Sequence, residues 1–320
     1  MGKTRIGVIG LGSFCRNYHI PNLLQRSDID VTAVCDVSQD ALEARPEGLS
    51  VSRTFSNVHA LLHANLIDGL IVSTSNAAHF DVCKAALEHD VPVLVDKPIT
   101  VTVEHAEKLV TLSKSSDVLL QTAFTRHFMS STEYVRRKIS SGELELQALT
   151  AIQRRSPDRH GPTDGGMLHR RTVHITDLLP WLTGRPVLSV SAVIDYEEGE
   201  REETFIEARL ELQGGLRATF LGIKHSEEYQ DEVNIYGADS SYRLERERLY
   251  TPTRRDGWKL ATDLSDYGNS TDHFIDKIQG REPKPNDPYA DRHSDDGLRA
   301  LRVVAAMHES ARTGKSVEIR

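Results

Sequence analysis

Two closely spaced glycines near the start of the chain carry the clearest chemical signal in this sequence. An apolar run over residues 6–9 leads directly into Gly10 and Gly12, and Ser13 and Phe14 follow them. A buried strand that breaks into glycines brings backbone amides against a pyrophosphate. Gly10 permits the tight turn out of the strand, and Gly12 leaves the approach free of side chains. The loop therefore predicts a nucleotide cofactor.

An acidic residue closes the second predicted strand. Asp36 follows an apolar run over residues 29–35 and lies 24 positions beyond the second glycine. A carboxylate at that place accepts hydrogen bonds from both ribose hydroxyls and repels a 2′-phosphate, which favours NAD over NADP. Val37 and Ser38, which come next, are compatible with NADP as well. The alternative interpretation is that Asp36 caps a helix that begins at Gln39.

The three cysteines of the chain give no metal-binding pattern. Cys15, Cys35 and Cys83 all lie in the first third, and their spacing matches no zinc site. We expect buried, reduced thiols in a cytoplasmic protein, and no bound metal. Cys15 stands where the glycine fingerprint has its third glycine or an alanine, so its thiol has to pack between helix and sheet.

Strand ends later in the first domain carry further polar side chains. Ser73, Thr74 and Asn76 follow an apolar run, and His79 comes just beyond them. Another apolar run, over residues 93–95, ends in Asp96, Lys97 and Pro98. A lysine fixed at that edge can stabilise charge on an oxygen next to a nicotinamide and take part in proton transfer. The alternative is an ordinary surface lysine before a turn proline.

The elements that must position these residues form an alternating pattern up to residue 123. Apolar runs alternate with helix-length segments such as 81–89 and 103–113, as a doubly wound parallel sheet requires. The predicted strands of this sheet are 6–9, 31–35, 67–72, 93–95 and 118–123. The fold class is therefore α/β for an N-terminal Rossmann domain over residues 1–123.

The alternation of strands and helices stops after residue 123, and we expect residues 124–320 to form a second, α+β domain. Residues 204–212 and 216–222 alternate polar and apolar side chains around two glycines, which predicts an antiparallel hairpin. An amphipathic helix over 297–313 ends at Gly314. Further strands are predicted at 146–153, 187–196, 232–236 and 242–244. This domain should be an open, mostly antiparallel sheet with helices.

Composition bounds the class of protein. At 320 residues the chain exceeds what one hydrophobic core usually supports, so two domains are expected. A net charge of −8 argues against nucleic-acid binding, and no apolar run is long enough for a bilayer. We therefore expect no nucleic-acid or membrane partner.

The chain resembles the Gfo/Idh/MocA oxidoreductases along essentially its whole length. The resemblance rests on Gly-Val-Ile-Gly-Leu-Gly at 7–12, Ser-Thr-Ser-Asn-Ala-Ala-His at 73–79 and Val-Leu-Val-Asp-Lys-Pro at 93–98, and on the His-x-x-Asp motif within 173–184. The order and spacing of these pieces are more specific than any one of them. Within the family the chain looks most like the branch called MviM virulence-factor homologues.

The resemblance implies roles for individual residues. Lys97 would lie by the nicotinamide, and Thr74, Asn76 and Asp96 would line the cofactor. His174 would face the substrate as general acid and base, and a neutral imidazole suits the movement of a hydroxyl proton. Three residues further along the chain, Asp177 could orient that ring. Arg126 would lie near the substrate, and the second-domain sheet would join subunits into a homodimer or homotetramer.

One departure from the family pattern concerns the proton relay. The family usually carries an aspartate four residues before this histidine, whereas this chain has Arg170. An arginine cannot accept a proton, and as a like charge it disfavours the imidazolium. It could clamp an anionic substrate, mark a lost activity, or belong to a solvated basic loop. The basic residues of this stretch are Arg154, Arg155, Arg159, His160, His169, Arg170 and Arg171.

Taken together, the residues predict an NAD(P)-dependent oxidoreductase. It would transfer a hydride to or from a hydroxyl or carbonyl group of a sugar-like small molecule, such as a sugar or a sugar acid. The alternative is a non-catalytic sensor or regulator that binds a dinucleotide and has an altered active site.

Overall fold

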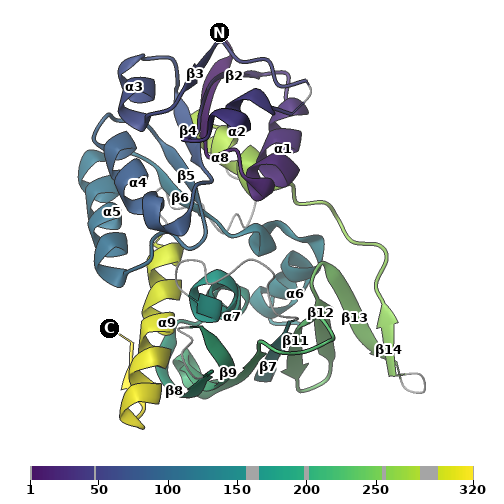
Figure 1. Ribbon diagram of the computed structural model, residues 1–320. Helices are drawn as coiled ribbons and strands as arrows, with labels where there is room; N and C mark the ends of the chain where they lie inside the picture. Colours follow the sequence, from purple (N-terminus) through teal and green to yellow (C-terminus); the bar gives the residue numbers. More distant parts are fainter. Residues whose placement is uncertain are drawn as a thin grey trace. The chain divides into compact units, whose positions relative to one another are not determined.

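A computed structural model gives the fold of residues 2–46, 48–155, 166–197, 202–253, 257–281 and 295–319 (Figure 1). The chain forms two compact units. Unit 1 comprises Met1–Phe124 and Gly268–Leu298, and unit 2 comprises Thr125–Tyr267 and Arg299–Arg320. The chain passes from unit 1 to unit 2 after Phe124, next to the predicted boundary between residues 123 and 124. The prediction had no later return to the first domain, whereas Gly268–Leu298 belongs to unit 1.

Unit 1 is built on a parallel sheet, which confirms the predicted Rossmann fold class. Within the described residues the sheet has six strands in the order β3-β2-β1-β4-β5-β6, and every neighbouring pair is parallel. The strands are β1 (Thr4–Ile9), β2 (Ile29–Cys35), β3 (Arg53–Phe55), β4 (Gly69–Val72), β5 (Val93–Asp96) and β6 (Leu120–Ala123). The order reverses between β1 and β4, and such a switch point is where ligands bind in doubly wound sheets.

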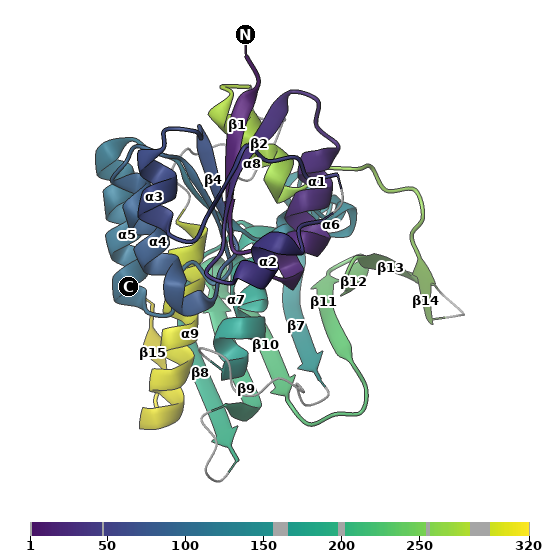
Figure 2. The same cartoon turned by 45° about the horizontal axis from the view of Figure 1, so that its top comes forward.

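Helices cover both faces of this sheet. In both views α3, α4 and α5 lie together on one face, while α1 and α8 lie on the other (Figures 1 and 2). The helical segments of unit 1 are η1 (Cys15–His19), α1 (Ile20–Leu24), α2 (Gln39–Glu43), α3 (Val58–His63), η2 (Asn76–Ala78), α4 (His79–Leu87), α5 (Val103–Ser116) and α8 (Ser270–Ile278). Because both faces are covered, β4 and β5 are apolar almost throughout.

Helix α8 explains why the late segment belongs to unit 1. The side chains of Phe274 and Ile275 are fully buried and pack in the same apolar cluster as β1 and β2. Asn269 caps the helix by accepting a hydrogen bond from the backbone N–H of Asp272 at 2.9 Å. The parallel sheet therefore needs a helix supplied from more than 140 positions beyond its last strand (Ser270 against Ala123).

Unit 2 contains a mixed sheet, mostly antiparallel as predicted. Within the described residues its nine strands follow the order β14-β13-β12-β11-β7-β10-β9-β8-β15, and β7 with β10 is the parallel pair. The strands are β7 (Leu146–Arg154), β8 (Val187–Tyr196), β9 (Glu203–Leu212), β10 (Leu216–Ile223), β11 (Gln230–Gly237), β12 (Ser241–Glu245), β13 (Arg248–Thr253), β14 (Gly257–Leu260) and β15 (Val317–Glu318).

The predicted hairpin is present. Strands β9 and β10 pair antiparallel from Leu212–Leu216 onward, and both Gly214 and Gly215 have positive φ, which the tight connection requires. Strands β13 to β15 were not predicted. Pro252 interrupts the alternation in β13, and the two-residue strand β15 is too short to give a pattern.

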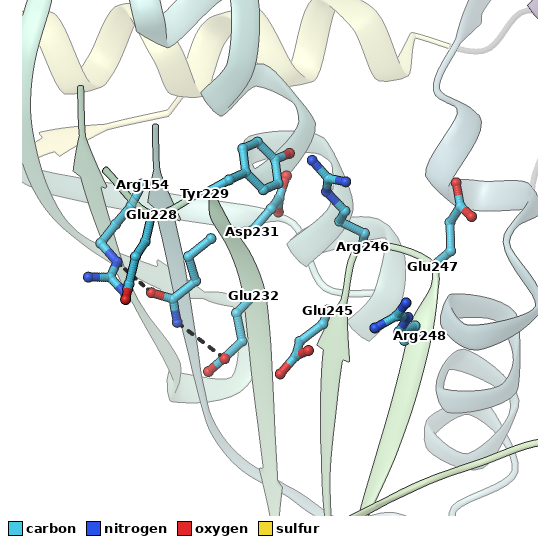
Figure 3. A pocket seen from close by; sticks show the side chains of 10 residues that line it. Arg154, Glu228, Tyr229, Asp231, Glu232, Glu245, Arg246, Glu247 and Arg248 are labelled. Carbon is cyan, nitrogen blue, oxygen red and sulfur yellow. Dashed lines mark hydrogen bonds and ion pairs between the residues drawn. The ribbon is translucent and has the colours of Figure 1, made fainter. Parts of the chain in front are cut away.

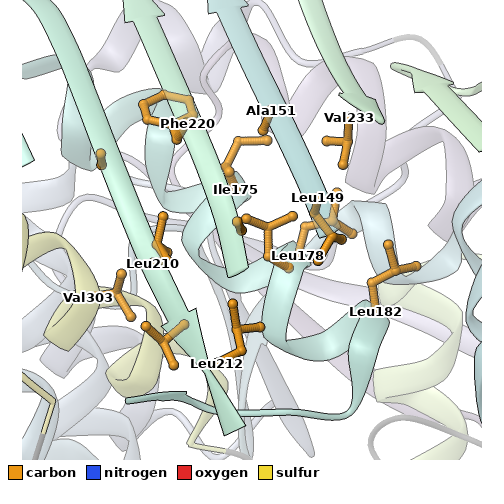
Figure 4. Close-up of a cluster of buried hydrophobic side chains, with 14 of the residues drawn as sticks. Leu149, Ala151, Ile175, Leu178, Leu182, Leu210, Leu212, Phe220, Val233 and Val303 are labelled. Carbon is orange, nitrogen blue, oxygen red and sulfur yellow. The ribbon is translucent and has the colours of Figure 1, made fainter. Parts of the chain in front are cut away.

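The core of unit 2 lies between this sheet and helices α6 (Ser130–Ser140), α7 (Val173–Thr183) and α9 (Asp296–Thr313). Figure 4 shows Leu149 and Ala151 of β7 gathered with Ile175 and Leu178 of α7. Short helical turns η3 (Thr125–Phe128), η4 (Leu168–Thr172) and η5 (Gln213–Gly215) complete the unit. No helix in the described ranges combines the length and apolar character that crossing a bilayer demands.

Substitution of Phe274 by alanine tests whether α8 is part of the unit 1 core. The ring is fully buried, so its loss should lower the free energy of unfolding by about 3–5 kcal/mol. Leu260→Ala, at a side chain 43% exposed, should cost less than about 0.5 kcal/mol. Urea unfolding followed by circular dichroism would measure both, and equal costs would contradict the assignment.

Candidate active site

The glycine loop begins where β1 meets β4. Gly10 has a φ of +86°, and a Cβ placed on it would lie 2.4 Å from the carbonyl oxygen of Ser73. No other residue fits there. Gly12 differs, because a Cβ on it would meet no atom of the described residues within 4 Å. The first glycine is thus required by the fold, and the second leaves open space beside the backbone, as a bound pyrophosphate needs.

Asp36 is held against this loop. Its Oδ2 accepts a hydrogen bond from the backbone N–H of Leu11 at 2.7 Å, and its Oδ1 accepts one from the N–H of Ser38 at 2.9 Å. The residue that caps helix α2 is Ser38, whose Oγ accepts from the N–H of Ala41. The alternative interpretation of Asp36 as the helix cap is therefore wrong, and its carboxylate is fixed at the strand end beside the glycines.

Two residues that follow the glycines, Arg16 and Cys15, fix the glycine loop to the rest of unit 1. Arg16 donates from Nε to the carbonyl oxygen of Leu11 at 2.6 Å and reaches the carbonyl oxygens of Ala41 and Ala44. Cys15 is fully buried in the apolar cluster of unit 1, so the thiol does pack where the fingerprint has its third small residue. Burial raises the pKa of Cys15 to about 12, which keeps the thiol protonated at neutral pH.

Of the other predicted loop residues, Ser13 and Phe14 are exposed. The Phe14 ring is 44% exposed and stacks on Tyr18 with centroids 5.0 Å apart. An exposed aromatic ring beside the glycines is compatible with a ligand contact, and the roles of both residues stay predictions.

A buried network fixes Asp96, the residue before Lys97. Ser73 donates from Oγ to Asp96 Oδ2, and Nε2 of His19 lies 2.9 Å from Oδ1. The other ring nitrogen, Nδ1, lies 2.8 Å from Oγ1 of Thr271 at the start of α8. Since a carboxylate only accepts, Nε2 is the donor in its contact with Asp96. Sequence reasoning missed His19 and Thr271, because 252 positions separate them.

His79 differs from its predicted role. Its side chain is fully buried, with Nδ1 2.8 Å from the carbonyl oxygen of Pro98 and Nε2 3.2 Å from that of Thr74. Burial also lowers the pKa of this imidazole. A fully buried ring cannot present itself to a cofactor, so the expectation that His79 lines the ligand is corrected. It braces the loop after β4 against the segment that follows Lys97.

Thr74, Asn76 and Lys97 remain partly accessible at the carboxyl ends of β4 and β5. Oγ1 of Thr74 makes a long hydrogen bond of 3.4 Å to the carbonyl oxygen of Ser75. Strand ends of a parallel sheet meet at one edge, so these side chains share the edge that carries the glycine loop.

In unit 2, Asp177 meets a different histidine from the one expected. Its Oδ2 lies 2.6 Å from Nε2 of His127, and both side chains are buried. The imidazole of His127 also stacks on Trp181, with centroids 4.3 Å apart. The prediction that Asp177 orients His174 is therefore replaced, because this carboxylate is engaged by His127. His174 itself is half-buried at the start of α7.

Burial governs the protonation of this pair. It raises the pKa of Asp177 well above its usual range, with Arg299 and Arg126 opposing the shift. It lowers the pKa of His127 well below the usual range, and the charges of Arg136 and Arg299 act in the same direction. Both shifts favour uncharged forms, as expected where no water solvates a charge.

A second carboxylate fixes the segment that leads into α7. Oε2 of Glu203 accepts from the N–H of Met167 at 2.6 Å, and the N–H of Leu168 lies 3.4 Å away. Gly166 has a φ of +64°, and a Cβ on it would lie 2.3 Å from the same oxygen. The helix that carries His174 is thereby attached to the first residue of β9.

Comparison with known proteins decides the family. Residues 4–124 match the profile described as an oxidoreductase family with an NAD-binding Rossmann fold. Residues 134–243 match the GFO/IDH/MocA C-terminal domain.

The chain belongs to the Gfo/Idh/MocA oxidoreductase family.

Three similar proteins illustrate this relationship. Myo-inositol 2-dehydrogenase of Thermotoga maritima is 27% identical over 205 residues, and the aligned part spans 61% of either protein, about three fifths of that relative's length. D-glucoside 3-dehydrogenase of Escherichia coli is 23% identical over 98% of this chain and 97% of its own. The WlbA dehydrogenase from Bordetella pertussis, solved in complex with NADH and UDP-GlcNAcA, has the same fold, with a TM-score of 0.83, 21% identity and 99% of both chains covered.

Arg170, where the Gfo/Idh/MocA resemblance implies an aspartate, is paired within the protein. Its NH1 lies 3.5 Å from Oε1 of Glu202, whose Oε2 lies 3.1 Å from Nζ of Lys224. In the rest of the basic stretch, Arg154 pairs with Glu228 at 2.8 Å. Arg159 and His160 lie outside the described residues. Arg155 lies over the ring of Tyr229, so Arg154, Arg155 and Arg170 each have an acidic or aromatic neighbour.

A pocket of about 690 Å³ opens at the ends of strands β11 to β13 (Figure 3). Tyr229 stands between two guanidinium groups, with Cζ of Arg246 3.7 Å and that of Arg155 4.7 Å from its ring centroid. None of the predicted site residues lines this pocket. Its lining residues are mainly charged: Arg154, Glu228, Tyr229, Gln230, Asp231, Glu232, Glu245, Arg246, Glu247 and Arg248.

Substitution of Gly12 by alanine tests the open space in the glycine loop. The added methyl group meets no atom in the part of the chain that the structure describes, so the free energy of unfolding should change by less than about 1 kcal/mol. If a pyrophosphate approaches there, the Kd for NADH should rise at least about tenfold. Gly2→Ala, which also adds a methyl group in open space, is the matched control. Fluorescence titration with NADH checks this, and an unchanged Kd in Gly12→Ala would argue against the assignment.

Proposed function

We propose that this protein is an NAD-dependent oxidoreductase that transfers a hydride between the cofactor and a CH–OH or carbonyl carbon of a sugar-like molecule. The observation that carries the proposal is the contact of Gly10 with Ser73 beside the open space at Gly12, with Asp36 fixed next to both. Relatives named for inositol and glucoside dehydrogenation support the substrate class. NADP remains compatible with the residues after Asp36.

The residues of unit 1 fit a dinucleotide. Gly12 leaves room for the pyrophosphate, and Asp36 retains free lone pairs for the ribose hydroxyls, since each carboxylate oxygen accepts more than one hydrogen bond. The same carboxylate would repel a 2′-phosphate, which favours NAD. Asp96, held from two sides by Ser73 and His19, presents a fixed negative charge near the predicted nicotinamide end.

Lys97 and His174 would divide the chemistry on the substrate oxygen. When bound, the nicotinamide supplies or accepts the hydride. The ammonium group of Lys97 stabilises negative charge that develops on the oxygen. His174, as a neutral imidazole, takes the hydroxyl proton during oxidation and returns it during reduction.

The presence of Arg170 where the family usually has an aspartate supports a second candidate function, a non-catalytic sensor that binds a dinucleotide. Arg170 cannot accept a proton, and Asp177 is engaged by His127. A non-catalytic sensor would keep the glycine loop and Asp36 but would have no use for Lys97 or His174. An anionic substrate clamped by Arg170 would have to compete with Glu202 for the guanidinium group.

We also propose that the sheet of unit 2 joins copies of the chain into a dimer or tetramer. Large apolar side chains are exposed on its strands, including Val193 at 57% and Leu188 at 46% on β8. Exposed apolar groups of this kind are typical of subunit contacts.

Separate substitution of the two proposed catalytic residues distinguishes enzyme from sensor. Lys97→Met and His174→Asn should each lower kcat about 10²–10⁴-fold and leave the Kd for NADH within about threefold. Lys84→Met, at a side chain on α4 that is 46% exposed, is the control for loss of a lysine charge. Turnover would be followed at the NADH absorbance with a panel of inositols, aldoses and sugar acids. Cofactor binding by the parent with no turnover on any of them would favour the sensor.

A further inference from the structure

Three buried polar side chains meet at the ends of β7 and β11 in unit 2. Gln153 is 1% exposed, Asp231 7% and Arg126 9%. Gln153 and Asp231 lie directly opposite each other in the antiparallel register. Because alternate residues of a strand share a face, they lie on the same side of the sheet as the core residues Leu149 and Ala151. These three side chains are called the acceptor cluster below.

Two donors of the acceptor cluster meet on one oxygen. Arg126 donates from NH2 to Oδ2 of Asp231, and Gln153 donates from Nε2 to the same Oδ2 at 3.3 Å. The orientation of the amide follows from this contact, since the reverse would set its oxygen against a carboxylate. Among the described residues, Oδ1 of Asp231 and Oε1 of Gln153 have no hydrogen-bond donor.

Two buried acceptors without donors are costly in a folded protein. Buried carboxylate and amide oxygens are nearly always paired, and an exception calls for a donor that completes the site. Asp231 is also one of the residues that line the pocket at the ends of β11 to β13, and Figure 3 shows its side chain on the opposite side of β11 from that of Glu232. Asp231 therefore connects the acceptor cluster to this pocket.

We propose that Oδ1 of Asp231 and Oε1 of Gln153 accept hydrogen bonds from hydroxyl groups of a neutral, polyhydroxylated substrate. An anionic group is disfavoured, because it would bring acceptors against acceptors. An ammonium group is disfavoured as well, because Arg126 already neutralises Asp231 and would repel a second cation. This inference rests on the proposed function and narrows its substrate class to neutral polyols and sugars over sugar acids.

The acceptor cluster and Arg170 thus point to different substrates. Arg170 would select an anion, but its guanidinium group already faces Glu202. In the acceptor cluster, the fully buried atoms that lack a partner among the described residues are both acceptors. Selection of hydroxyl donors by buried acceptors discriminates sharply, because an analogue lacking the hydroxyl leaves the protein group unpaired.

Ligand-observed saturation-transfer NMR on the full-length protein, with NAD bound, tests this directly. The probes are myo-inositol and D-glucose, the monodeoxy analogues of whichever binds, and D-glucuronate. The parent should bind a neutral polyol saturably, bind at least one monodeoxy analogue about tenfold more weakly, and bind D-glucuronate less tightly than D-glucose. Tighter binding of the uronate, or no binding of either neutral probe, would overturn the inference without any variant.

Variants then assign the effect to the acceptor cluster. Gln153→Met removes one acceptor at similar volume, and Asp231→Asn changes the other; each should raise the Kd of the neutral polyol about tenfold and leave the Kd for NADH unchanged. Glu133→Gln, at a buried carboxylate on α6 that is not among the residues lining the pocket, is the control. Unchanged polyol affinity in both folded variants would refute the proposal. If the parent binds a polyol, the variants weaken that binding and the protein shows no turnover, the proposed function is refuted and the inference about the acceptor cluster stands.

Discussion

The structure of unit 1 depends on one close approach, in which the backbone of Gly10 lies against the carbonyl group of Ser73. No side chain fits between them, so β1 and β4 are held at their carboxyl ends at a separation that only glycine allows. The same contact brings Ser73 to Asp96 on β5, and His19 then ties Asp96 to Thr271 of α8. One steric constraint thus aligns the strand ends that carry the predicted cofactor residues.

Unit 2 is organised by carboxylates that serve as internal partners. Glu203 attaches the start of the α7 segment, Glu202 takes Arg170, and Asp177 meets His127. Two of these pairings involve Arg170 and Asp177, which the sequence analysis had assigned to substrate binding. In the acceptor cluster, two buried oxygens have no donor within the described residues, and they carry the more specific information about a ligand.

Local patterns were sufficient for the glycine loop, the hairpin of unit 2 and the strands of the parallel sheet other than β3, which was not predicted. Gly10, Asp36 and Cys15 could be placed because short-range rules govern a strand end and a tight turn. The pairings of His19 with Thr271 and of Asp231 with Gln153 could not be predicted, because the partners are 252 and 78 positions apart and no periodicity links them. Asp177 was assigned to His174 from helix spacing, but burial against His127 determined its contact. The return of α8 to unit 1 was missed for the same reason, although Asn269 and the apolar Phe274 and Ile275 gave a local helix signal.

The most direct test of this account is a fluorescence titration of the protein, freed of carried-over ligand, with NADH and with NADPH. If the glycine loop binds the pyrophosphate, NADH should bind saturably. Because the carboxylate of Asp36 repels a 2′-phosphate, NADPH should bind at least about tenfold more weakly. If neither coenzyme gives a saturable signal at millimolar concentration, the close packing of Gly10 serves the fold alone and the account is contradicted.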